Sequence, residues 1–144
     1  MQRLRSATVE GCGTHMQWLC EANLVDEALR TAALLERSHA LGVELWRVDD
    51  WGALVEDGIT NERLWLQGLR PQINSRFERL LLATHGPILA LTRGERATPE
   101  LLRAFAPPGR RYLSVGGADA AAIVQAAVRL AQDDGGEWIR LAVT

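Results

Sequence analysis

Three polar residues stand where predicted strands end, and their types limit the chemistry that the chain could perform. Glu21 and Gln67 close two apolar segments, and Thr92 follows a third. Ligands of open α/β sheets bind in the crevice at the carboxyl ends of the strands, so these three side chains would converge there. Because the set lacks a nucleophile, a base and a cation in the arrangement that catalysis needs, we expect no enzyme. A small enzyme or ligand-binding domain that uses this crevice is the alternative.

Soft metal ligands and a glycine-rich turn gather near the N-terminus. Cys12, His15 and Cys20 lie close together in the sequence, but they do not form a C-x-x-C pattern and a fourth ligand is missing. Structural zinc is four-coordinate, so these residues do not predict a zinc site. The glycine-rich segment 11–14 precedes an apolar segment and does not open a helix, as a cofactor-binding turn would. We expect neither a metal nor a cofactor.

The composition is that of a globular domain. The chain has 144 residues, of which 47% are hydrophobic and 24% charged, and its net charge is −2. This length is sufficient to bury a core, and the charge balance provides no basic surface for a nucleic-acid backbone. No apolar run could span a bilayer and no secretory signal is evident, so we expect a cytoplasmic protein without membrane association. The sequence contains no lysine, and arginine supplies every cationic side chain apart from histidine.

Segments of strand type alternate with segments of helical period, which predicts a parallel sheet with helices on both faces. The predicted strands are 16–21, 43–48, 63–67, 87–91 and 112–115. The predicted helices are 24–38, 73–84, a helix opened by Thr98 and stopped by Pro107, and 118–132, with a short helix at 49–57. We expect one domain at 16–134, preceded by an N-terminal extension at 1–15. The tail 135–144 either adds a strand or begins a missing output domain.

Five βα units in this order resemble the receiver domain of bacterial response regulators. The segment LWLQGLRP is similar to the family's stretch around the phosphorylated aspartate, with Gln67 at the acceptor position and Pro71 four residues later. Thr92 stands at the family's threonine or serine, Tyr112 at its switch aromatic and Val115 at its lysine. The resemblance implies a flavodoxin-like three-layer fold with a five-stranded parallel sheet in the order 2-1-3-4-5.

The departures from the family pattern imply that the phosphorylation site is degenerate. Gln67 replaces the carboxylate acceptor, and a neutral amide cannot form an acyl phosphate. Val115 replaces the ammonium that would pair with the phosphate. Magnesium needs oxygen ligands, usually carboxylates, yet Glu21 matches only one acid of the family's turn, and Ala22 or Asn23 stands where another is expected. The sequence therefore predicts a pseudo-receiver with no catalytic residue and no metal.

The resemblance also implies a role in two-component signal transduction or transcription regulation, exercised by phosphorylation-independent protein–protein interaction. We expect a protein partner or a second copy of the chain, as a homodimer, to bind at the fourth helix, fifth strand and fifth helix. We expect no direct nucleic-acid binding by this domain, since DNA would be contacted only through a missing output domain. The alternative on the same fold is a small flavodoxin-like enzyme or ligand-binding domain.

Overall fold

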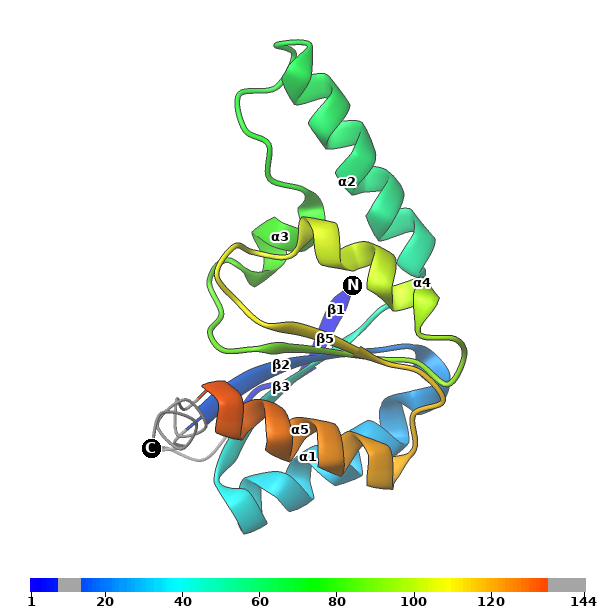
Figure 1. Ribbon diagram of the computed structural model, residues 1–144, viewed down its shortest axis with the longest axis vertical. Coiled ribbons are helices and arrows are strands. Elements are labelled where there is room, and N and C mark those ends of the chain that lie inside the picture. The colour runs from blue at the N-terminus through cyan, green and yellow to red at the C-terminus, as the bar shows by residue number, and fades with distance from the viewer. Residues whose placement is uncertain (8–13, 135–144) are drawn as a thin grey trace, which may run out of the picture.

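The fold is built on a five-stranded mixed sheet, and the computed structural model describes residues 1–7 and 14–134. The strands are β1 Gln2–Arg5, β2 Thr14–Cys20, β3 Leu41–Arg47, β4 Ile88–Leu91 and β5 Tyr112–Val115. They lie in the order β1-β3-β2-β4-β5 (Figure 1). Four of them run parallel, whereas β1 pairs antiparallel with β3 at one edge.

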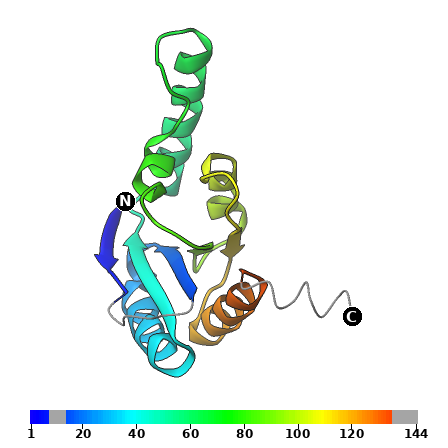
Figure 2. The ribbon, with the colours of Figure 1, turned by 90° about the vertical axis from the view of Figure 1, so that its left-hand side faces the viewer.

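Helices cover both faces of this sheet. The α-helices are α1 Val25–His39, α2 Trp51–Leu66, α3 Arg76–Leu81, α4 Ala97–Glu100 and α5 Ala120–Asp134, and the 3-10 helices are η1 Ala22–Leu24 and η2 Leu101–Phe105. α1 and α5 lie side by side on one face, and α2, α3 and α4 lie on the other (Figures 1 and 2). None of the helices in the described ranges combines the length and the apolar character needed to cross a membrane.

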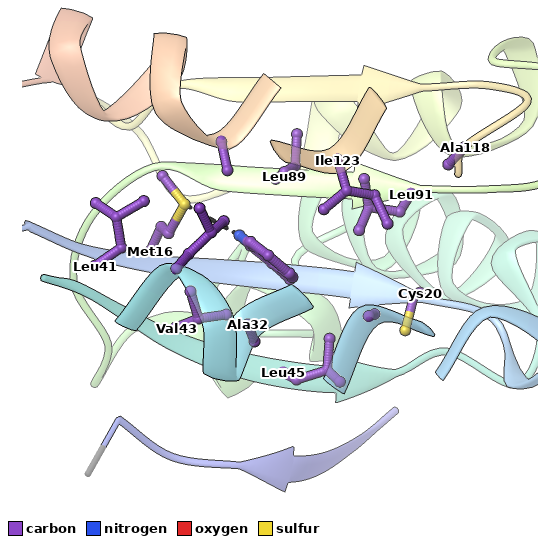
Figure 3. Packing of buried hydrophobic residues seen from close by; sticks show 14 of the residues in the cluster. Met16, Cys20, Ala32, Leu41, Val43, Leu45, Leu89, Leu91, Ala118 and Ile123 are labelled. Atoms are coloured by element: carbon purple, nitrogen blue, oxygen red, sulfur yellow. Dashed lines mark hydrogen bonds between the residues drawn. The ribbon is translucent and has the colours of Figure 1, made fainter. Parts of the chain in front are cut away.

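Each face of the sheet has its own apolar core because side chains alternate along a strand. On β2, Met16, Trp18 and Cys20 belong to the cluster under α1 and α5, and the close view shows Met16 and Cys20 in it (Figure 3). Leu19 points to the opposite face, where it joins the cluster that contains Phe77 of α3. β2 is thus buried on both sides, as a central parallel strand should be.

The predicted α/β class with helices on both faces is confirmed, but the predicted all-parallel order 2-1-3-4-5 is wrong. The segment 63–67, expected to be the third strand, forms the last turn of α2 and its C-cap. α2 begins at the N-cap Asp50, whose carboxylate accepts the Ala53 N–H at 3.1 Å, and it continues through Gly58 to Leu66. Four parallel strands remain, and the fifth strand of the sheet is the antiparallel β1.

Residues 2–5 lie within the sheet, although the prediction places them in an extension that precedes the domain. They form β1, and Arg5 ties this strand to the body of the protein. Its guanidinium donates to the Val43 carbonyl at 2.6 Å and pairs with the Glu36 carboxylate at 2.9 Å. The tail 135–144 and Cys12 lie outside the described residues.

Candidate functional site

The structure brings four of the predicted site residues to one edge of the sheet. Glu21 follows β2, Thr92 follows β4 and Val115 ends β5, and these strands are neighbours in the order β2-β4-β5. The Thr92 N–H donates to the Val115 carbonyl at 3.0 Å, so the ends of β4 and β5 are directly joined. Ala22 begins η1 at the same edge. These residues therefore share the carboxyl edge, as the alternation of strands and helices predicts.

Gln67 does not belong to this edge. It is the C-cap of α2, its side chain is exposed, and its N–H donates to the Arg63 carbonyl at 3.1 Å. α2 points away from the sheet, and its C-terminal end lies far from the carboxyl ends of the strands (Figure 1). The placement of Gln67 at the end of a sheet strand, and hence at an acceptor position, is wrong, because the residue caps a helix.

An ion pair links the segment that follows β4 to α1, which follows β2. The Arg93 guanidinium donates to the Asn23 carbonyl at 3.1 Å and pairs with the Glu27 carboxylate at 2.7 Å. The other oxygen of Glu27 accepts the Ala120 N–H, the first of α5, at 3.0 Å. A helix N-terminus attracts anions, and here the chain's own carboxylate occupies that place. A phosphate-bearing ligand would have to displace Glu27.

Glu21 and Thr92 have structural partners at the carboxyl edge. The Glu21 carboxylate accepts the indole N–H of Trp51 at 3.1 Å and so fixes the first residue of α2. The Thr92 hydroxyl accepts the Gly94 N–H at 3.0 Å within the turn that follows β4. Both contacts hold elements in place.

Tyr112, predicted to be a switch aromatic, is buried under α4. Its hydroxyl donates to the Pro99 carbonyl at 2.6 Å, and burial raises the pKa of the phenol. Beside it, Glu100 accepts hydrogen bonds from Arg103 and Ser114, which lower the pKa of the carboxyl group to about 2. The Arg103 guanidinium also lies over the Tyr112 ring, 5.3 Å from its centroid. The polar groups around Tyr112 are thus hydrogen-bonded or packed against one another.

The described cysteine is not reactive. Cys20 is fully buried, and burial, together with the nearby charge of Glu21, raises the pKa of its thiol to about 12. The thiolate is the nucleophilic form, so this residue is inert at neutral pH. His15 is exposed on β2. Within residues 1–7 and 14–134, no three metal-ligating side chains come close enough to hold a metal ion.

The feature that the sequence prediction misses is an arm formed by α2 and the loop 67–75. The arm projects beyond the helical layer (Figures 1 and 2). A buried amide holds its two halves together: the Asn61 Nδ2 lies 2.6 Å from the Ile73 carbonyl and 3.0 Å from the Asn74 carbonyl. The Arg70 guanidinium donates to the Asn61 carbonyl oxygen at 3.2 Å. The loop therefore has a defined conformation against the helix.

Large apolar side chains are exposed along this arm. They are Ile59, Trp65, Leu66, Leu69 and Ile73, and Leu66 and Leu69 have exposed fractions of 76% and 69%. At the base of the arm lies a recess of about 440 Å³. Its lining is apolar at Met1, Ala53 and Leu54, acidic at Asp49, Asp50 and Asp57, and basic at Arg76. The signal that could have revealed the arm is the helical spacing of the buried residues of α2, which are Trp51, Leu54, Gly58 and Asn61.

Part of the chain is similar to curated proteins of known activity. The pyruvate dehydrogenase E1 component of Mycobacterium tuberculosis is 32% identical over 101 residues, which is 69% of this chain and 11% of that protein. The same component of Mycolicibacterium smegmatis is 30% identical over 92 residues, or 63% of this chain and 10% of that protein. The chain thus spans about a tenth of the length of the curated relatives it matches. No model of a known protein family matches the sequence.

Proposed function

We propose that this chain is a non-catalytic protein-interaction domain that associates with a protein of the pyruvate dehydrogenase E1 type. The observation that carries the proposal is the arm, whose apolar side chains are exposed to solvent. Contiguous exposed apolar surface on a folded protein marks sites of interaction with other proteins. The partner is chosen from the similarity to the E1 components, which extends over more than 60% of this chain.

The construction of the arm favours binding. Asn61 fixes the loop against α2, so that little conformational entropy is lost when a partner docks. Trp65 is among the exposed apolar residues, and tryptophan is enriched among the residues that dominate binding energy at interfaces. The arm thus offers a preformed apolar surface at a distance from the sheet.

The carboxyl edge of the sheet supports an interaction role in a different way. Its polar groups already bind one another, through Arg93 and Glu27 on one side and through Glu100 and Ser114 on the other. A substrate that binds at this edge would have to break these contacts first. The interaction role expected from the sequence is therefore retained in this proposal, and the receiver assignment remains a prediction.

A titration with the purified E1 component of Mycobacterium tuberculosis tests this function. We expect saturable binding of the fluorescently labelled chain. The double substitution Leu69→Asp with Ile73→Asp should weaken it at least about tenfold, because it places charges in a desolvated contact. Leu34→Asp is the matched control, since Leu34 is 48% exposed on α1, away from the arm. Absence of binding, or equal losses in the double variant and the control, would contradict the proposal.

A further inference from the structure

We propose that two copies of this chain associate through their α2 helices, which pair antiparallel about a two-fold axis beside Ile59. This association rests on the interaction role of the arm and names a second copy as a partner. It involves five exposed residues of α2 that follow one another at three- and four-residue steps, here called the outer stripe. The outer stripe consists of Ala53, Glu56, Ile59, Arg63 and Leu66.

The outer stripe lies on the solvent side of the helix. Residues three and four positions apart share one face of an α-helix, so its five members form a continuous row. The residues that α2 buries form a different row, which includes Leu54, Gly58 and Asn61. Ile59 is 55% exposed on the outer stripe, and Leu66 is more exposed still. The protein's own core does not cover these apolar side chains.

The order of residues along the outer stripe is complementary to itself. When two copies of α2 run antiparallel with the axis beside Ile59, Glu56 of one copy faces Arg63 of the other. The two-fold symmetry repeats this pair, and it also places Leu66 opposite Ala53 and Ile59 next to its own counterpart. Among the residues that the structure describes, neither Glu56 nor Arg63 has an ion-pair partner within its own copy.

The same alignment brings the tip of one arm to the base of the other, where the charges of the two segments are opposite. Residues 49–58 contain four acidic residues and no basic one, whereas residues 63–75 contain two arginines and no acidic residue. The recess of about 440 Å³ at the base includes Ala53, the residue that faces Leu66. Opposite charges therefore meet at both ends of the pair, which selects the antiparallel register.

The area that two α2 helices can bury limits the affinity of the homodimer. A helix of 16 residues is about 24 Å long, so one helix pair buries less than the roughly 800 Å² per partner of a standard interface. We therefore expect a reversible monomer–dimer equilibrium at micromolar concentrations, which weakens at high salt because its ion pairs are exposed.

Sedimentation of the full chain with charge-reversal variants tests this arrangement. Glu56→Arg and Arg63→Glu should each weaken the homodimer at least about tenfold, because each variant places two like-charged pairs in contact. An equimolar mixture of these two variants should regain the wild-type affinity, because every facing pair in the heterodimer then has opposite charges. Arg30→Glu, an exposed reversal on α1, should leave the equilibrium unchanged.

Three results would overturn this arrangement: a wild-type chain that stays monomeric at its highest soluble concentration, a dimer indifferent to both reversals, or a mixture that associates no better than its components. Recovery in the mixture also shows that both variants fold. The E1 titration uses Leu69 and Ile73, which lie outside the outer stripe, so failure of either proposal can be recognised separately.

Discussion

At the scale of single residues, the arm depends on the buried amide of Asn61, which links α2 to the loop that follows it. We expect Asn61→Ala to lower the free energy of unfolding by about 1–3 kcal/mol, because the carbonyl groups of Ile73 and Asn74 lose their donor. Urea unfolding followed by tryptophan fluorescence measures this change. Hydrogen exchange should become faster in the loop 67–75, while the sheet keeps its protection.

Gln67 provides the matched control for Asn61. Both residues carry an amide on the arm, but Gln67 is exposed and Asn61 is buried. Gln67→Ala should therefore change the free energy of unfolding by no more than about 0.5 kcal/mol. If both substitutions cost the same, the buried amide is not what fixes the loop.

At the scale of elements, the sequence predicts the helices and strands whose apolar residues follow one regular spacing along the whole element. The sequence predicts α1, α5 and the four parallel strands close to their observed bounds. The sequence does not predict the full length of α2. Its buried row includes Gly58 and Asn61, so the apolar spacing is lost in the half of the helix that projects from the domain. The exposed Trp65 and Leu66 then give 63–67 an apolar character that is also typical of a strand.

The candidate site, like the secondary structure, is predicted from the sequence only in part. Glu21, Gln67 and Thr92 are predicted to converge at one edge because the carboxyl ends of parallel strands meet there. Glu21 and Thr92 lie at that edge, whereas Gln67 caps α2. The bridge between Arg93 and Glu27 joins residues 66 positions apart, and no local pattern indicates such a pair. The sequence does not predict the arm, because its exposed apolar residues resemble buried ones in the sequence. The distinction between the two depends on the tertiary structure.

Gly58 sets the distance between α2 and η2. A Cβ atom at this position would lie 2.6 Å from the Phe105 ring, so Gly58→Ala forces the two elements apart. We expect the substitution to lower the free energy of unfolding by about 1–3 kcal/mol, although alanine favours a helix by about 1 kcal/mol over glycine. Gly52→Ala, on the exposed face of the same helix, should cause no loss, because its Cβ atom would meet only the exposed Asp50 carboxylate, at 3.3 Å. Urea unfolding compares them, and equal stabilities would refute the close contact.

At the scale of the whole molecule, the strand order decides which loops share an edge. The chain between β3 and β4 contributes no strand to the sheet, and it forms the arm and α3 instead. In the receiver resemblance, that part of the chain supplies both a strand and the acceptor. The topology therefore separates position 67 from position 115, which ends β5 at the carboxyl edge. A pocket that needs both residues has no counterpart in this arrangement.

This separation predicts how the chain responds to a phosphoryl mimic. We expect Mg²⁺ with beryllofluoride to leave the tryptophan fluorescence unchanged, both in the wild-type chain and in Gln67→Asp. Trp51 is a suitable reporter because its indole binds Glu21 at the carboxyl edge, where an anion would enter. A receiver domain with its full set of acids serves as the positive control. A saturable, magnesium-dependent change that Gln67→Asp strengthens would place position 67 in an anion site, because a new carboxylate acts on beryllofluoride only where the two are in contact.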